Sequence, residues 1–256
     1  MTPNKPYAQP TWLILLCILL AACSSPTEYE TTMTWSPVQV DSEIEGNKAI
    51  EAIIAPYKAD LDAKMNEVIG YAAHDLTSRG GYESDLGTFV TKLLLTQSRS
   101  VFKTEVDVAI MNHRGGLRAP INEGPITLGE VFEVMPFENE MRLIELTGDQ
   151  LMEVIRHVGK SGRSMIWPVR FSVANSVVSK VSLNGKAIVP DQTYVLAISD
   201  YLANGGGGFN MLTDLKRIEV TPALQRDFIV NEIRQKTAQG DSIDTKVANL
   251  VTVADQ

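Results

Sequence analysis

The chain has 256 residues and a formal net charge of −8 at pH 7, from 23 basic and 31 acidic residues. An acidic balance of this size disfavours binding to a nucleic-acid polymer or to an anionic membrane surface. The 2 cysteines and 3 histidines show no HxH or HExxH spacing, so the sequence predicts no metal site in this chain.

The first 22 residues have the pattern of a lipoprotein signal peptide. An apolar run from Trp12 to Leu20 is too short to span a bilayer, and it is followed by Ala21, Ala22 and Cys23. The small residues before Cys23 resemble a bacterial lipobox, so Cys23 is expected to carry lipid; a plain secretory signal with a coincidental cysteine is the alternative. These features predict a lipid-anchored protein of the bacterial cell envelope, either periplasmic or associated with the outer membrane.

Residues 23–45 are polar with scattered prolines and predict a flexible tether, so the folded domain is expected to comprise residues 46–256. From Lys48 onward, apolar residues repeat every three or four positions, which predicts a helix. Pro56 is interpreted as the first turn of its main part. A second helix is predicted over residues 85–94, with Ser84 or Asp85 at its N-cap.

The remaining elements predict a layered domain. Strands are predicted over residues 106–111, 141–146, 166–173, 177–183, 194–199 and 247–253. Thr127 followed by Glu130 predicts a capping box and a short helix, and further helices are predicted after Asp149 and over residues 222–238. Strands and helices interleave and include hairpins, so the predicted fold is α/β, in a layered α+β form with a mixed β-sheet flanked by helices.

One stretch without helical or strand periodicity, residues 112–139, has the composition of a binding site. Its Gly115-Gly116 pair lets backbone approach a ligand closely. Arg118 can donate two parallel hydrogen bonds to a carboxylate or a phosphate. Phe137 supplies a flat face beside the amide of Asn139.

A second loop, residues 200–209, follows another buried-type strand. Tyr201 in this loop can face Phe137 across a planar ring, and a core position for Tyr201 is the alternative. The four glycines at 205–208 permit either an ordered binding loop or a mobile surface loop. His157, near the end of a predicted helix, is interpreted as a partner of the helix dipole and not as a catalytic group.

In these two loops the sequence resembles the C-terminal, substrate-binding domain of the bacterial 5'-nucleotidase (UDP-sugar hydrolase) family. The resemblance runs from about residue 53 to residue 233. It rests on five pieces: NHRGGLR (112–118), GPIT (124–127), VMPFEN (134–139), LTG (146–148) and GGGGF (205–209). No piece is specific by itself, but their order and spacing together are.

The resemblance implies a nucleotide or nucleoside ligand whose base stacks between Phe137 and Tyr201, with Arg118 and Asn139 in contact with the nucleotide. The residues that it places in the substrate-binding site are Arg79, Arg118, Phe137, Asn139, Gly162, Tyr201 and Gly207. Gly207 departs from the family pattern Gly-Gly-Asp-Gly, whose aspartate binds the ribose hydroxyls.

Members of the family carry a metallophosphatase domain ahead of this one, whereas here only a signal and a tether precede residue 46. The resemblance therefore implies a nucleotide-binding domain that acts in nucleotide catabolism, through phosphoester hydrolysis by a separate metallophosphatase subunit. Divalent metals are expected in that partner, and neither a cofactor nor a catalytic residue is expected in this chain. A stand-alone nucleoside- or nucleotide-binding lipoprotein and a degenerate interaction module remain as alternatives.

Overall fold

A computed structural model describes residues 33, 35–37 and 44–254. The predicted signal peptide and lipidation at Cys23 lie outside these residues. The chain divides into two units, Met1–Lys48 and Ala49–Gln256, and the described residues of the first unit before Lys48 form neither helix nor strand. No helix in the described ranges combines the length and the apolar character needed to cross a bilayer.

Helix α2 (Lys48–Met65) is the first predicted helix, but it contains Pro56 in its interior and does not begin there. The interpretation of Pro56 as a first turn is therefore wrong. Ala49 and Ala55 are strong helix formers that extend the helix upstream of the proline. Pro56 leaves the carbonyl of Ala52 without a helical donor. Because no α2 side chain is buried, water can solvate that carbonyl.

The centre of the fold is a five-stranded sheet of order β5-β2-β8-β4-β9. Its strands are β2 (Val108–Met111), β4 (Glu140–Thr147), β5 (Met165–Trp167), β8 (Thr193–Ser199) and β9 (Arg217–Leu224). β2 and β8 run parallel, and the other neighbouring pairs are antiparallel. The predicted mixed sheet is thus confirmed.

Two small sheets and further helices surround this sheet. β1 (Val68–Ala72) pairs with β3 (Gly124–Thr127), and a three-stranded sheet contains β6 (Val169–Ala174), β7 (Val177–Leu183) and β10 (Val251–Val253). The helices are α3 (Asp85–Phe102), α4 (His113–Gly116), α5 (Leu128–Val134), α6 (Gly148–Ser161), α7 (Asp200–Ala203) and α8 (Gln225–Ala238). Short 3-10 turns cover Gly206–Gly208 and Asn210–Leu212.

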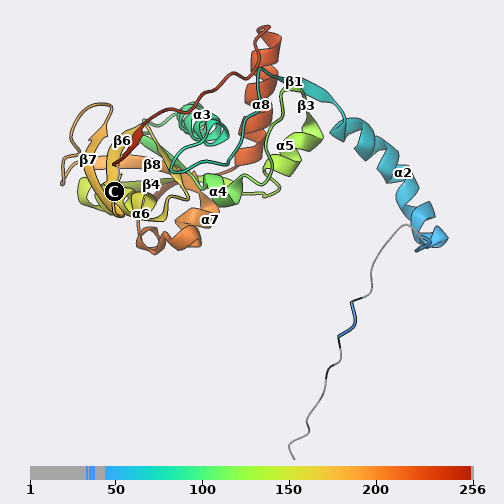
Figure 1. Ribbon diagram of the computed structural model, residues 1–256, viewed down its shortest axis with the longest axis horizontal. Helices are drawn as coiled ribbons and strands as arrows, with labels where there is room; N and C mark the ends of the chain where they lie inside the picture. The colour runs from blue at the N-terminus through green and yellow to red at the C-terminus, as the bar shows by residue number, and fades with distance from the viewer. Residues whose placement is uncertain (1–32, 34, 38–43, 255–256) are drawn as a thin grey trace, which may run out of the picture. The chain divides into compact units, whose positions relative to one another are not determined.

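The side chains of the central sheet alternate between two cores, one on each face. On β2, Ala109 and Met111 join a core with α3 and α8, whereas Val108 and Ile110 join a core with α6. Figure 1 shows α3 and α6 on opposite sides of β4 and β8. The central sheet is therefore covered by helices on both faces, as the sequence predicts.

Hydrogen-bonded caps fix two of the predicted helix starts. Ser84, and not Asp85, caps α3, because its hydroxyl accepts a hydrogen bond from the N–H of Gly87 at 3.0 Å. Thr127 and Glu130 form the predicted capping box at the start of α5.

Several predicted element boundaries are wrong: α3 runs on to Phe102, β10 begins only at Val251, and two further differences change how the elements are arranged. The run predicted as one strand over 166–173 is divided at Pro168, which has no N–H to donate to a neighbouring strand. The run therefore forms two strands, β5 in the central sheet and β6 in the three-stranded sheet. Residues 222–224, predicted as helix, extend β9, where Leu224 pairs with Glu140 of β4. The helix begins only at Gln225.

Candidate functional site

Three loops meet at one edge of the central sheet. The carboxyl ends of β2 and β8 lie together because these strands are parallel. β4 is antiparallel to β8 with Met141 opposite Ser199, so the loop before β4 reaches the same edge. Residues 112–118, 135–139 and 199–208 are thereby brought together. Ligands commonly bind at the carboxyl ends of parallel strands.

The three loops border a cavity of about 530 Å³, a volume within the usual range for a small-molecule site. Its lining residues are Met111, Asn112, Gly115, Gly116, Arg118, Phe137, Asn139, Arg163, Ser199, Tyr201, Leu202, Gly207 and Gln225. The residues predicted from the sequence that the structure places here are Arg118, Phe137, Asn139, Tyr201 and Gly207.

The other two predicted residues do not line this cavity. Arg79 is exposed, and its N–H donates to the hydroxyl of Thr77 at 3.0 Å within its own loop. Gly162 ends α6 with a φ of 57°, and a Cβ at this position would lie 3.3 Å from the ring of Tyr82. Its neighbour Arg163 enters the cavity lining instead.

Four polar lining residues were not predicted as site residues: Asn112, Arg163, Ser199 and Gln225. Asn112 and Ser199 stand where predicted strands end, and this position at the edge of the sheet is a signal for a binding role. Arg163 and Gln225 have no such signal in the sequence, because each reaches the cavity only through the packing of the helix beside it.

The loop after β2 presents Arg118 from a fixed backbone. The N–H of Arg118 donates to the carbonyl of Val134 at 2.8 Å, and the N–H of Gly116 donates to the carbonyl of Asn112 at 2.7 Å. A Cβ on Gly115 would lie 2.9 Å from the side-chain amide nitrogen of Asn112, so a larger residue here would displace the Asn112 side chain. The exposed Arg118 guanidinium is thus available to a ligand in the cavity.

The loop that carries Phe137 is held from behind by Arg226, which is 6% exposed. Its Nη1 donates to the carbonyls of Met135 and Phe137, both at 3.4 Å, and its guanidinium lies 4.0 Å from the centre of the Phe132 ring. Its Nη2 lies 3.8 Å from a carboxylate oxygen of Glu138. Phe137 itself remains 38% exposed, so its ring is free to contact a ligand.

Gln225, which is 1% exposed, supports the next residue of this loop. Its N–H donates to the carbonyl of Asn139 at 3.0 Å, and its side-chain nitrogen lies 3.1 Å from the sulfur of Met141. Its side-chain oxygen is buried without a hydrogen-bond partner among the described residues. The start of α8 therefore fixes the main chain on both sides of Glu138.

Tyr201 lies beside the four glycines at 205–208, called here the glycine loop. Its hydroxyl accepts a hydrogen bond from the N–H of Gly207 at 3.3 Å, and a Cβ on Gly206 would lie 2.5 Å from its ring. Nε2 of His157 lies 3.0 Å from the carbonyl oxygen of Gly207, so this histidine contacts the glycine loop. Gly208 has a φ of 83°, which favours glycine. Tyr201 is 53% exposed, so the alternative of a core position for it is wrong.

The cavity is basic although the protein is acidic. Arg118 and Arg163 line it, and no aspartate or glutamate of the described residues does. Nearby carboxylates have other partners, since Asp200 Oδ1 accepts the N–H of Glu140 at 3.2 Å and Glu140 pairs with Arg142 at 2.6 Å. This distribution of charge favours an anionic ligand.

His113, the first residue of α4, is fully buried, and its Nδ1 lies 3.1 Å from the hydroxyl of Ser84. Burial, together with the charge of Arg114, lowers the pKa of His113 from 6.5 to about 4. The histidine is therefore neutral at pH 7, and it connects the start of α4 with the N-cap of α3.

We expect the stability of the protein to fall as the pH decreases from about 6.5 to 4. In this range the unfolded chain binds a proton at His113 that the folded protein excludes, so the free energy of unfolding decreases by up to about 1.4 kcal/mol per pH unit. His113→Asn, which keeps a side-chain nitrogen near Ser84, should flatten this dependence. Urea unfolding of both proteins at several pH values measures it, and parallel profiles would show that His113 is not responsible.

Comparison with known proteins identifies the family. The family model described as "5'-nucleotidase, C-terminal domain" matches residues 68–214. The chain is 30% identical over 234 residues to the endonuclease YhcR of Bacillus subtilis (strain 168), covering 82% of this chain and 19% of that protein. It is 26% identical over 185 residues to the 5'-nucleotidase of Vibrio vulnificus (strain CMCP6), covering 69% of this chain and 32% of that protein.

Among solved structures, the fold matches the 5'-nucleotidase precursor from Thermus thermophilus with a TM-score of 0.68 and 25% sequence identity, over 81% of this chain and 43% of that one. The chain thus spans less than half the length of each of these three relatives. The matched residues 68–214 include all three loops around the cavity. The chain therefore belongs to the 5'-nucleotidase family, of which it represents the C-terminal domain.

Proposed function

We propose that this domain binds a nucleotide for hydrolysis by a metallophosphatase carried on a separate polypeptide, in nucleotide catabolism at the cell envelope. The observation that carries the proposal is the cavity, which is bordered by two exposed rings, Phe137 and Tyr201, and by the guanidinium of Arg118. Aromatic rings stack on flat bases, and arginine pairs with phosphate. The names of the relatives from Vibrio vulnificus and Thermus thermophilus, both 5'-nucleotidases, support the same ligand.

Each residue has a role in this proposal. Phe137 and Tyr201 stack on the base, Asn139 forms hydrogen bonds with it, and Arg118 holds a phosphate group. No three His, Cys, Asp or Glu side chains of the described residues gather as a metal site, so we assign no bond-breaking step to them. The partner would supply a metal-activated water, while this domain binds and orients the nucleotide.

The proposal predicts that the full chain forms a complex with a metallophosphatase of this family from the same cell. Hydrolysis of AMP by the Mn²⁺-loaded complex should exceed that of the phosphatase alone by roughly tenfold or more, because bound substrate is presented to the metal site. Size-exclusion chromatography measures the complex, and phosphate release measures the activity.

Arg118→Gln provides the control, since it should still form the complex but lose most of the gain in hydrolysis. The proposal would be contradicted by the absence of both complex and gain. It would also be contradicted if the pure chain hydrolysed AMP by itself with Mn²⁺ or Zn²⁺. If the chain bound AMP tightly but formed no complex, the result would support the alternative of a stand-alone nucleotide-binding protein.

A further inference from the structure

A second arginine, Arg163, lines the cavity, and its main chain is attached to α4 nearer the start of that helix than Arg118. The carbonyl of Arg163 accepts the N–H of Arg114 at 3.2 Å, near the start of α4, whereas Arg118 follows the end of α4 and is fixed to Val134. Arg114 and Arg118 are four residues apart, and α4 ends at Gly116 between them, so the two attachment points are distinct. The two cations therefore approach the cavity from separate places.

Neither of these two arginines is neutralised by the protein. Across residues 33, 35–37 and 44–254, neither Arg118 nor Arg163 has a carboxylate oxygen within 4.0 Å, although Arg142 and Arg226 nearby do. Both are exposed. Two unpaired guanidiniums in a cavity lined by no described acidic residue can each hold an anionic group of a ligand.

Gly207 contributes no side chain, and therefore no charge, to the cavity wall. A Cβ at this position would lie 3.8 Å from the amide nitrogen of Asn112 and 3.1 Å from a methyl group of Leu202, both of which line the cavity. A carboxylate here would accept hydrogen bonds from ligand hydroxyls and would repel an anion. With glycine, this wall presents the amide of Asn112 and no negative charge.

We infer that the ligand carries negative charge at two separated positions: a nucleotide phosphorylated on both sides of its ribose, such as a nucleoside 3',5'-bisphosphate. Arg118 binds one phosphate and Arg163 binds the other, in a cavity whose wall at Gly207 carries no charge. The inference rests on the proposed function, because it takes the same cavity as a nucleotide site. The inference differs from the proposed function because a second phosphate, and not a free ribose diol, is recognised.

Calorimetry on the full chain with AMP, ADP and adenosine 3',5'-bisphosphate at constant ionic strength tests this inference. The bisphosphate should bind roughly ten- to a hundredfold more tightly than AMP, because it adds one charge-assisted pairing. ADP should gain less, since its second phosphate lies next to the first. Equal or weaker binding of the bisphosphate than of AMP, or an equal gain for ADP, would overturn the inference while leaving the proposed function intact. Failure of all three to bind would overturn both.

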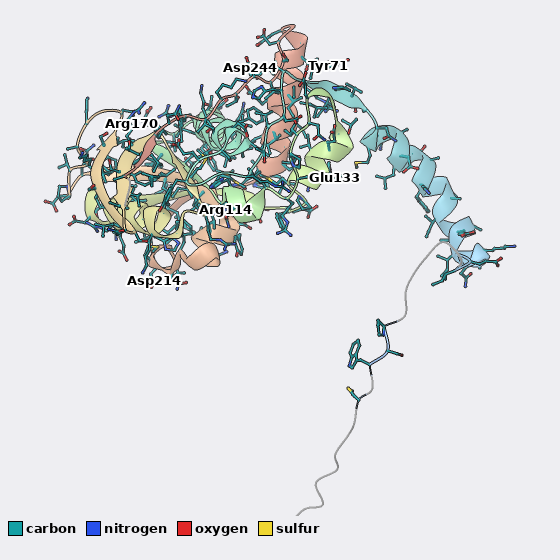
Figure 2. The ribbon with its side chains drawn as sticks, in the orientation of Figure 1. Tyr71, Arg114, Glu133, Arg170, Asp214 and Asp244 are labelled. Atoms are coloured by element: carbon teal, nitrogen blue, oxygen red, sulfur yellow. The ribbon has the colours of Figure 1, made fainter. Side chains whose placement is uncertain are left out.

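Variants of the cavity residues test where the second phosphate binds. The measured quantity is the ratio of the affinity for the bisphosphate to the affinity for AMP, because any partial unfolding of a variant lowers both affinities equally. Arg163→Gln should bring this ratio close to one. Gly207→Asp should lower it by repulsion, whereas Gly207→Asn, which has nearly the same volume and equal tolerance of positive φ, should not. Arg114→Gln removes one charge outside the cavity lining and should preserve the ratio; Arg114 is labelled in Figure 2. An unchanged ratio in Arg163→Gln, or equal effects of the two Gly207 variants, would overturn the assignment.

Discussion

Replacing Phe137 by alanine is expected to weaken AMP binding by roughly five- to a hundredfold, because stacking of one base on an aromatic ring contributes about 1 to 3 kcal/mol. Phe137 is 38% exposed and lines the cavity, so its ring contributes little to the core. The variant should therefore unfold at nearly the same urea concentration as the parent protein. Calorimetry on the full chain measures the change in affinity.

Phe137→Tyr is the matched control, because it keeps a ring of the same shape and should retain most of the affinity. Tyr201→Ala is a less direct test, since the hydroxyl of Tyr201 also accepts the N–H of Gly207 and its loss would loosen the glycine loop. If Phe137→Ala bound AMP as tightly as the parent protein, the ring would not be a stacking platform and the nucleotide site would lie elsewhere.

Much of the fold could be predicted because its central strands are buried on both faces. The continuous apolar runs of β2 and β8 can be recognised from the local sequence alone, and so can the capping box of Thr127. β9 was not predicted, and its last residues were assigned to a helix, because they are held as a strand by pairing with β4. The short β1 and β3 include Gly70 and Pro125 and lack a strong alternating pattern, so they were not predicted.

The candidate site could be predicted where it follows the strands directly. Arg118 and Tyr201 come soon after β2 and β8, and Phe137 comes just before β4, so the sheet brings them together. Arg163 and Gln225 could not be found in this way, because the packing of α6 and α8 carries them to the cavity. Arg79, placed in the site by resemblance alone, lies outside the cavity lining, and its role stays a prediction.

Arg226→Met is expected to reduce both stability and nucleotide affinity, although Arg226 does not line the cavity. Met135 is fully buried, and its carbonyl would lose a hydrogen-bond donor, at a cost of about 1 to 3 kcal/mol. Loss of the contact with the Phe132 ring costs about 1 to 2 kcal/mol more. Together these changes should lower the free energy of unfolding by about 2 to 5 kcal/mol, as measured by urea unfolding.

The same substitution removes the hydrogen bond to the carbonyl of Phe137, so the ring is held less firmly and the affinity for AMP should also fall. Calorimetry at a temperature where the variant is folded measures this affinity. Arg226→Lys keeps the charge but loses the planar fork that serves two carbonyls, and its effects should be intermediate. Arg234→Met, on the exposed side of α8 where Arg234 pairs with Glu67 at 3.0 Å, should cost at most about 1 kcal/mol and leave affinity unchanged. If Arg226→Met lost stability but bound AMP as tightly as the parent protein, the loop would hold Phe137 in place without Arg226. If the affinity instead fell by more than the fraction of unfolded protein can explain, Arg226 would be identified as the residue that positions the ring.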